Sequence, residues 1–273
     1  MTAEYDRCAP AADLAWREHL REILLYGKPV SPRGQPTLEI LQTKNIVVDM
    51  ARPLITSPAR KLYNRFAVAE ALWILSGDNR LEPLQRFIKD YDRFSDDGQT
   101  LFGAYGPPVA SQIDYVVKAL VDDRETRQAA LTIWRQNPPR SRDVPCTIAA
   151  VFSIRDDKLH AHFMMRSSDA WLGIPNDLLC FAMIGAKVAC LYNRHNFAHP
   201  VQLGALCVSM TSAHLYLRDQ EKAEAVLASP TAPSFEPVPE RLVLEGAWDK
   251  IEDSLIAVRE KLPLQDWMWK VIQ

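Results

Sequence analysis

Residues 165–177 read Met-Arg-Ser-Ser-Asp-Ala-Trp-Leu-Gly-Ile-Pro-Asn-Asp, and this stretch decides the fold. An alternating apolar pattern over 158–165 comes before it, and a nearly unbroken apolar run over 178–192 comes after it. The first pattern predicts a half-buried strand, and the second predicts a buried helix. The stretch therefore carries an arginine and two aspartates across the junction between a sheet and a core helix.

Patterns elsewhere in the chain predict helices first and strands in the middle. Helical patterns cover 11–26, 59–76, 81–94, 111–122 and 214–228. Strand patterns cover 128–134, 147–155, 158–165 and 203–212, with a tight turn at Asp156-Asp157. This order favours a single α+β domain over residues 1–273 rather than alternating βαβ units. No G-x-G-x-x-G or Walker A motif is present.

Composition and charge describe an ordinary globular chain. The 273 residues are 48% hydrophobic and 24% charged, and the net charge of -2 gives no support for a surface that coats nucleic acid. Five cysteines occur without metal-ligand spacing, which argues against a disulfide framework and against a metal site. Because no leader and no apolar run of about 20 residues is found, we expect a cytoplasmic protein with no membrane partner.

Cys146 differs from the other cysteines in its surroundings. It lies between a polar loop over 137–143 and a predicted strand. Apolar runs, which are typical of buried structural cysteines, surround Cys180, Cys190 and Cys207. A nucleophilic thiol needs its pKa of about 8.5 lowered, usually by nearby positive charge. Arg166 could supply that charge from the neighbouring strand, so Cys146 is the first candidate for a nucleophile.

A cysteine followed by R-S-x-D-x-x-L-G-x-P-x-D resembles the centre of the thymidylate synthase family, and the resemblance runs from about Arg33 to Tyr216. It implies a thymidylate synthase-like fold, with a central mixed or antiparallel sheet, covering helices and a dimer through a sheet face. It also implies that Cys146 attacks a pyrimidine nucleoside monophosphate and that 5,10-methylenetetrahydrofolate is the co-substrate, without a metal. The family's Arg-Ser pair, here Arg166 and Ser167, holds the nucleotide phosphate.

The resemblance assigns further arginines to the phosphate. Arg33 matches a phosphate-binding arginine in an N-terminal loop of the family. Arg127 matches the first of two adjacent arginines that the partner subunit contributes across the dimer interface. The second of these is Gln128 here, so one phosphate contact is lost or moved, and Arg124 is an alternative donor.

Two aromatic motifs extend the resemblance to the sugar and to the reacting centre. His214 and Tyr216 match the family's D-x-H-x-Y motif, which binds a sugar hydroxyl, although the aspartate of that motif is Ser212 here. Tyr105-Gly106 matches a Tyr-Gly pair in the active-site loop, which makes Tyr105 a catalytic candidate. A lone His-x-Tyr is a weak signal, and its order and distance along the chain make it credible.

Glu70 lies in A-V-A-E-A-L-W-I-L-S-G-D, which resembles the family's H-E-L-L-W-F-L-x-G-D helix. A carboxylate in an apolar helix is costly unless it is partnered or functional, and burial raises its pKa toward neutrality, which suits proton transfer. The other interpretation is a salt bridge at the helix end. The resemblance puts Glu70 in contact with the folate, together with Tyr91, which replaces a tryptophan, and Asp169 and Gly173.

Asp177 departs from the synthase pattern, in which the base-reading residue is an asparagine that answers uracil N3-H and O4 together. A carboxyl group can instead give a proton to cytosine N3 and accept from N4-H2, which activates C6 for Cys146. Aspartate here marks the cytidylate hydroxymethylases of the family. Near the base, Thr147 and Met165 replace a histidine and a glutamine. A one-residue shift would make Asn176 the reader, and the spacing from Gly-x-Pro argues against it.

The resemblance thus implies a (d)CMP 5-hydroxymethylase. Cys146 adds to C6, C5 takes up the one-carbon unit, tetrahydrofolate leaves, and water ordered by Glu70 adds to the exocyclic methylene. The rival functions are a thymidylate synthase that methylates dUMP by hydride transfer and a catalytically silent nucleotide-binding homologue. The choice between CMP and dCMP, and with it the pathway, stays open. The tail from Trp267 lacks the family's usual ending, which leaves its closing role open.

Overall fold

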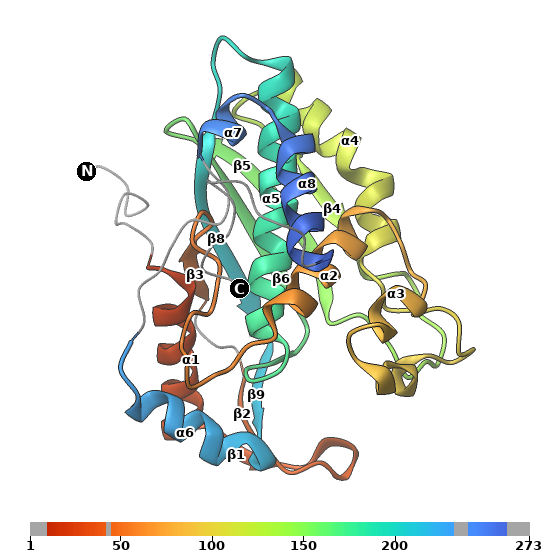
Figure 1. Ribbon diagram of the computed structural model, residues 1–273, viewed down its shortest axis with the longest axis vertical. Helices are drawn as coiled ribbons and strands as arrows, with labels where there is room; N and C mark the ends of the chain where they lie inside the picture. The colour runs from red at the N-terminus through yellow and green to blue at the C-terminus, as the bar shows by residue number, and fades with distance from the viewer. Residues whose placement is uncertain (1–9, 42–44, 232–239, 261–273) are drawn as a thin grey trace.

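Two β-sheets form the centre of the computed structural model, which describes residues 10–41, 45–231 and 240–260 (Figure 1). The larger sheet has five strands in the order β3-β8-β6-β5-β4, and the smaller has four in the order β1-β2-β9-β7. The strands are β1 Lys28–Val30, β2 Thr37–Leu41, β3 Ile46–Asp49, β4 Ala130–Thr132, β5 Thr147–Arg155, β6 Lys158–Met165, β7 Ser168–Asp169, β8 Gln202–Met210 and β9 Ser212–Tyr216.

Each sheet is mixed because each contains one parallel pair. β6 pairs with β8 in parallel, and β7 pairs with β9 in parallel, whereas the other neighbouring strands are antiparallel. Only Thr211 separates β8 from β9, so the chain passes directly from the larger sheet into the smaller one. Asp156 and Asp157 both have positive φ, as a two-residue hairpin turn between β5 and β6 requires. The expected α+β fold with mixed sheets is confirmed.

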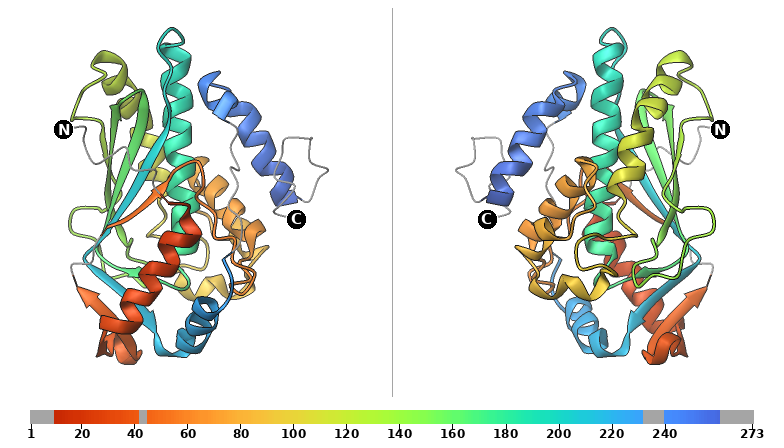
Figure 2. Two further views of the ribbon diagram at one scale, coloured as in Figure 1. Left: turned by 90° about the vertical axis from the view of Figure 1, so that its left-hand side faces the viewer. Right: turned by 90° about the vertical axis from the view of Figure 1, so that its right-hand side faces the viewer.

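The helices lie mainly on one side of the larger sheet. They are α1 Ala12–Tyr26, α2 Asn64–Leu75, α3 Glu82–Gln85, α4 Gly106–Asp122, α5 Ile174–His195, α6 Gln220–Ala228, α7 Glu240–Leu244 and α8 Trp248–Glu260, with short 3-10 turns η2 Pro32–Gly34, η3 Lys89–Phe94 and η4 Leu217–Asp219. α5 runs along the larger sheet, and α2 and α8 lie on the side of α5 that faces away from this sheet (Figure 2). Contrary to the expectation that no apolar run approaches the length of a membrane span, α5 is long and apolar enough to cross a membrane. Most of it is buried inside the protein, as in the core helix of a folded domain.

The packing of β6 against α5 fixes the junction that carries the sequence motif. Phe163 stacks on Phe181 of α5 with ring centroids 4.0 Å apart, and burial of each ring contributes about 1.5–3 kcal/mol. The inward side chains of β6 are all buried: Leu159, Ala161, Phe163 and Met165. Its outward side chains are half-buried: His160, His162 and Met164. Because the register is fixed by this alternation, Arg166 emerges at a defined edge of the sheet.

Two of the helix predictions are wrong. The helix predicted over 214–228 begins only at Gln220. Residues 212–216 form β9 instead, with alternate side chains buried in the core, and this strand pairs with β2 and β7. His214 and Tyr216 therefore lie on a strand. The helix expected over 81–94 is divided into α3 and η3, because Ile88 has an extended backbone. The loop expected over 27–37 is interrupted by β1 and η2.

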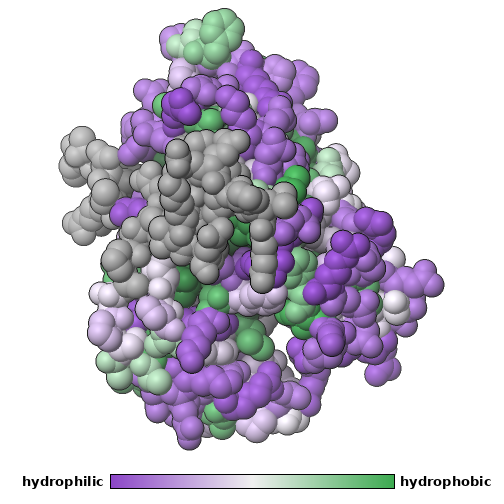
Figure 3. Space-filling model, viewed as in Figure 1, coloured by the Kyte–Doolittle hydropathy of each residue, from purple (hydrophilic) through white to green (hydrophobic). Residues whose placement is uncertain are grey.

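The face seen in Figure 1 is mostly hydrophilic. Hydrophilic residues cover α6 and α3, and apolar residues form small groups between them (Figure 3). The exposed large apolar side chains of the described part are scattered over separate elements, among them Leu25 and Tyr26 on α1 and Phe197 after α5. Scattered apolar residues of this kind are normal on a folded protein.

Candidate active site

Arg166 braces the turn that carries Cys146. Its guanidinium donates from Nε to the carbonyl of Pro145 at 2.9 Å and from Nη2 to the carbonyl of Val144 at 2.8 Å. Its backbone N-H donates to the carbonyl of Cys146 at 2.9 Å. Hydrogen bonds from a charged donor are among the stronger ones in proteins. The structure therefore brings Arg166 beside Cys146, as the sequence suggested, and holds both on one rigid edge.

The pKa of the Cys146 thiol is raised, contrary to the expectation that positive charge lowers it. Burial is the largest cause, and the nearby carboxylates Asp177 and Asp143 add to it. Arg166 and Arg33 lower the pKa, but burial together with the two carboxylates outweighs them. The free thiol is therefore held protonated, and activation has to come with the substrate or by transfer of the proton to a neighbouring group.

Asp177 lies in the first turn of α5 and points back toward Gly173. Its backbone N-H donates to the carbonyl of Gly173 at 2.9 Å, and a Cβ built on Gly173 lies 3.3 Å from Oδ2 of Asp177. The amide of Asn176 is turned elsewhere, because its Nδ2 donates to the carbonyl of Leu172 at 3.3 Å. The two candidates for the base reader therefore have different neighbours, and Asp177 is the one whose charge acts on Cys146.

Three carboxyl groups lie close together behind the thiol. Burial, followed by the charges of Glu70 and Asp169, holds the pKa of Asp177 well above its usual range. The phenol of Tyr105 is also buried, and the charges of Asp177 and Cys146 add to burial in raising its pKa well above the usual value. A carboxyl group whose pKa is raised in this way keeps its proton to a higher pH than usual, so the cluster can store and donate a proton.

Glu70 is held by an aromatic hydroxyl and not by a cation. Tyr91 donates from its hydroxyl to Oε1 of Glu70 at 3.2 Å. Burial raises the pKa of Glu70 to about 7, and the hydrogen bond from Tyr91 opposes that shift. No ion pair to Glu70 is found in the part of the chain that the structure describes. The helix-end salt bridge is therefore not formed, and Glu70 can move a proton near neutral pH.

Ser167, His214 and Tyr216 come together where β7 meets β9. Nδ1 of His214 lies 3.3 Å from Oγ of Ser167, and the rings of His214 and Tyr216 meet edge to face with centroids 5.3 Å apart. Burial lowers the pKa of His214, the carboxylates Asp169 and Glu39 raise it, and two arginines oppose them. The imidazole thus presents a polar edge next to the Arg166-Ser167 pair.

A comparison with known families agrees with this arrangement. A family model described as thymidylate synthase matches residues 15–254, which is most of the chain. The chain belongs to the thymidylate synthase family. A sequence relative is a deoxyuridylate hydroxymethyltransferase of Pseudomonas phage M6, which is 34% identical over 113 residues. That match covers 38% of this chain and 32% of the relative, so the chain spans about a third of the length of this curated relative.

The family's folate-side residues form a compact turn in this chain. Oδ1 of Asp169 accepts hydrogen bonds from the backbone N-H of Trp171 at 2.8 Å and of Leu172 at 3.0 Å. The backbone N-H of Gly173 donates to the carbonyl of Asp169 at 3.0 Å. Asp169 therefore shapes the turn that starts α5. Burial raises the pKa of its carboxyl, and the two backbone donors oppose that shift.

The phosphate arginines of the family are only partly assembled in one chain. Arg33 lies in η2 with a left-handed φ of 54° and influences both Cys146 and His214. Arg127 and Gln128 are exposed in the segment before β4. Arg124 is engaged by its own chain, because it donates to the hydroxyl of Tyr192, the carbonyl of His199 and the carboxylate of Asp157. Cys8 and the tail from Trp267 lie outside the described residues.

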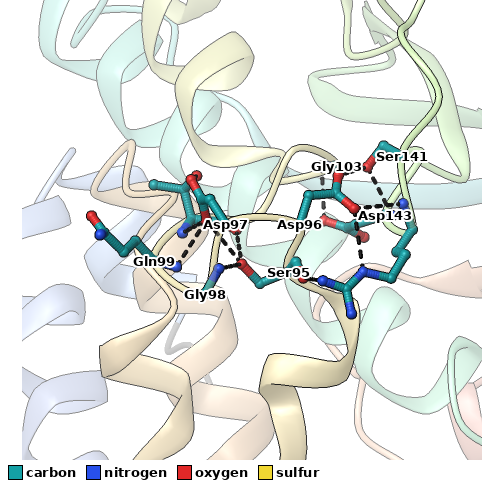
Figure 4. A network of polar contacts seen from close by, with 10 residues as sticks. Ser95, Asp96, Asp97, Gly98, Gln99, Gly103, Ser141 and Asp143 are labelled. Atoms are coloured by element: carbon teal, nitrogen blue, oxygen red, sulfur yellow. Dashed lines mark hydrogen bonds and ion pairs between the residues drawn. The ribbon is translucent and has the colours of Figure 1, made fainter.

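The sequence analysis missed a polar clamp between the Cys146 loop and the loop that leads to Tyr105. Ser141 donates to Oδ2 of Asp96 at 2.6 Å, and the backbone N-H of Arg142 donates to Oδ1 at 3.1 Å. Gly103 donates from its backbone N-H to Oδ2 of Asp143 at 2.8 Å (Figure 4). The acidic pair 96–97 and an aspartate three residues before the candidate nucleophile were the available signals.

Replacing Gly103 by alanine should displace this clamp. A Cβ on Gly103 meets the carbonyl oxygen of Asp143 at 2.6 Å and its Cγ at 2.9 Å, so backbone has to move. We expect a loss of about 1–3 kcal/mol of folding stability and a faster reaction of Cys146 with iodoacetamide, because a displaced loop exposes the buried thiol. Gly98→Ala is the control, since it strains the same loop through a φ of 73° but meets no atom. Equal alkylation rates in both variants contradict the clamp.

Glu70→Gln should stabilise the protein at alkaline pH. The folded-state pKa of about 7 exceeds the ordinary value of 4.5. Between these values the folded protein keeps a proton that the unfolded chain has lost, so the contribution of Glu70 to stability falls as pH rises through about 7. Urea unfolding should show Glu70→Gln more stable by up to about 3 kcal/mol at pH 8 and equal to wild type near pH 4. Exposed Glu125→Gln should show no such pH-dependent difference.

Proposed function

We propose that this protein hydroxymethylates C5 of the cytosine base of CMP or dCMP, with 5,10-methylenetetrahydrofolate as the co-substrate. The observation that carries the proposal is the Asp177 carboxyl, buried beside Cys146 and Tyr105 with its pKa well above the usual range. A neutral carboxyl group in that place can donate its proton to a base whose N3 carries no hydrogen. Cytosine is such a base, whereas N3 of uracil already carries its hydrogen.

Asp177 and Cys146 act together in the proposed first step. Donation of a proton from Asp177 toward N3 of cytosine withdraws electrons from the ring and makes C6 more electrophilic. The Cys146 thiol passes its proton by way of Tyr105 to the Asp177 carboxylate, its sulfur bonds to C6, and electron density moves to C5. The raised pKa of the free thiol supports a mechanism in which Cys146 attacks only when a polarised base is bound. Tyr105, between the thiol and the carboxyl, is the candidate for relaying the proton.

The basic and hydroxyl groups around β7 and β9 fit a nucleotide phosphate and sugar. Arg166, Ser167 and Arg33 converge near the thiol, and a guanidinium beside a hydroxyl suits a phosphate dianion. His214 and Tyr216, on the same strand, are proposed to contact a sugar hydroxyl. Within the described residues, no group of three or more His, Cys, Asp or Glu side chains can hold a metal ion.

Two unsatisfied polar atoms support a ligand on the folate side. Nε of Arg60 and Oδ1 of Asn176 are buried without a hydrogen-bond partner among the described residues. Both side chains flank the turn after Asp169, since Arg60 donates to the carbonyl of Trp171 at 2.9 Å and stacks on its ring at 4.5 Å. Buried unpaired polar groups are costly and point to a missing partner. Bound there, 5,10-methylenetetrahydrofolate supplies the one-carbon unit, and Glu70, Tyr91, Asp169 and Gly173 are its proposed contacts.

The hydroxymethyl product follows from the proposed role of Glu70. With its pKa near 7, Glu70 can accept a proton from water as the oxygen bonds to the exocyclic methylene, the C5–C6 double bond re-forms, and the bond from C6 to the sulfur of Cys146 breaks. Tyr91, which bonds Glu70, leaves a polar hydroxyl beside that position. The relative from Pseudomonas phage M6, which carries the name of a hydroxymethyltransferase, supports addition of water over transfer of hydride.

A second candidate function is hydroxymethylation of dUMP. It is favoured by the name of the same relative, a deoxyuridylate hydroxymethyltransferase. Methylation of dUMP is a third outcome that has to be separated from both. The name describes the relative, and the position of Asp177 in this chain is the reason for ranking cytidylate first.

The deciding experiment compares CMP, dCMP and dUMP as substrates with 5,10-methylenetetrahydrofolate. We expect a 5-hydroxymethyl product from CMP or dCMP, seen by mass, without formation of dihydrofolate. A 5-hydroxymethyl product from dUMP alone establishes the second candidate. Dihydrofolate formed together with a 5-methyl product from dUMP identifies a thymidylate synthase and refutes both hydroxymethylase proposals.

We also propose a homodimer through the outward face of the larger sheet. His160, His162 and Met164 on that face are only half-buried in one chain, and Arg127 is exposed. In the proposed dimer Arg127 reaches the phosphate of the partner's nucleotide, which completes the set that Arg33, Arg166 and Ser167 begin. Sedimentation equilibrium checks the dimer, and mixing an Arg127→Ala variant with a Cys146→Ala variant tests sharing, because only the mixed dimer then contains one intact site.

A further inference from the structure

We propose that Glu39 is a positioning residue for His214 and replaces, from β2, the carboxylate that the D-x-H-x-Y motif lacks at Ser212. The proposal rests on the proposed function, in which His214 contacts the nucleotide sugar. Glu39 is 173 residues away from Ser212 in sequence, and its position next to the motif is a property of the fold. No pattern in the sequence connects the two.

The strand register places Glu39 opposite His214. β2 and β9 are antiparallel, with Glu39 paired to His214 and Leu41 paired to Ser212. Directly opposed residues of an antiparallel pair point to the same side of the sheet. Ala213 and Leu215 are buried in the core, so Ser212, His214 and Tyr216 share the other side with Glu39. The carboxylate therefore lies on the face that carries the sugar residues.

A hydrogen bond joins the substitute carboxylate to the altered motif position. Ser212 donates from Oγ to Oε1 of Glu39 at 2.5 Å. This bond holds the Glu39 side chain on the diagonal between Ser212 and His214, where its charge acts on the imidazole. In the motif of the family, an aspartate at the Ser212 position would put a carboxylate in the same neighbourhood. A carboxylate is thus present next to His214 in both cases, but in this chain it comes from β2 instead of β9.

The charge of Glu39 matters because His214 lies among groups of both signs. Asp169 and Glu39 are the carboxylates that act on it, and Arg33 and Arg166 are the cations. Ser167 meets Nδ1 at 3.3 Å, and Tyr216 meets the ring edge. Without Glu39, Asp169 alone would balance two guanidinium groups on the imidazole. In the proposed role, the charge of Glu39 helps to keep the imidazole beside Ser167.

The test combines Glu39→Gln with the double variant Glu39→Gln, Ser212→Asp. Glu39→Gln should raise the KM for CMP, dCMP or dUMP, whichever is turned over, about tenfold, and kcat should change less than about threefold, because binding and not chemistry is affected. The double variant returns a carboxylate to the side of the sheet that carries His214, and it should bring KM most of the way back to the wild-type value. Exposed Glu221→Gln on α6 should leave KM and kcat unchanged.

A second measurement separates positioning from general damage to the strand. In NMR of histidine-labelled protein without ligand, Glu39→Gln should lower the pKa of His214, and the double variant should raise it again. An unchanged His214 titration, or a KM that the double variant does not recover, overturns the proposal. If wild type binds none of CMP, dCMP and dUMP, the proposed function fails, while the His214 titration still decides the role of Glu39.

Discussion

Replacing Cys146 by serine should abolish product formation while leaving the fold intact. We expect kcat to fall by at least about 10⁴-fold, since the proposed reaction has no route that avoids the bond from sulfur to C6. Release of tritium from C5 of labelled CMP or dCMP should stop as well, because exchange at C5 requires prior addition at C6. Serine differs from cysteine by one atom, so Arg166 can still brace the turn through the carbonyls of Pro145 and Val144.

Cys207→Ser is the matched control. Cys207 is a half-buried free cysteine on β8, outside the cluster around Asp177. It should keep wild-type activity and wild-type tritium release. If Cys146→Ser still exchanges tritium at the wild-type rate, Cys146 is not the nucleophile. If wild type releases tritium and Cys146→Ser binds nucleotide equally well without releasing it, the exchange depends on this thiol. The interpretation as a catalytically silent homologue is then also excluded.

Local sequence patterns predicted the parts of the fold that carry strong alternation. β5 and β6 have the predicted bounds, since β6 buries every second side chain, β5 does so from Ala150 onward, and a two-residue turn joins them. The pattern failed at 214–228. There His214 and Tyr216 lie among charged residues that suit a helix, and pairing with β2 and β7 outweighs that local preference. The partner strand β2 lies far away in sequence, so a reading along the chain could not find it.

The candidate site was predictable where a motif carried it. The motif singled out Cys146, Arg166 and Asp177 as candidates, and the fold brings Arg166 and Asp177 close to Cys146. The expected pKa of the thiol was wrong, because burial, which is a property of the packed structure, outweighs the nearby arginines together with the carboxylates Asp177 and Asp143. Glu39 could not be found in the same way, since its effect on His214 depends on strand register.

Asp177→Asn should move the base preference from cytidylate to dUMP. An asparagine amide can pair with uracil O4 and N3-H and, when flipped, with cytosine N3 and N4-H2, but it cannot transfer a proton to cytosine N3. Loss of a general acid costs about 10²–10⁴-fold in rate. We therefore expect the ratio of kcat/KM for cytidylate over kcat/KM for dUMP to fall by about 10²–10⁴-fold.

Asn176→Ala is the matched control for Asp177→Asn, because it changes the neighbouring residue whose amide faces the carbonyl of Leu172. It should alter the KM for the folate and leave the base preference as in wild type. Asp177→Asn should also stabilise the protein at neutral pH, since it removes a carboxyl whose pKa is raised by burial and by Glu70 and Asp169. A variant that gains this stability but keeps the cytidylate preference would show that Asp177 is buried beside the base without reading it. A loss of preference in Asn176→Ala would instead assign the base contact to that residue.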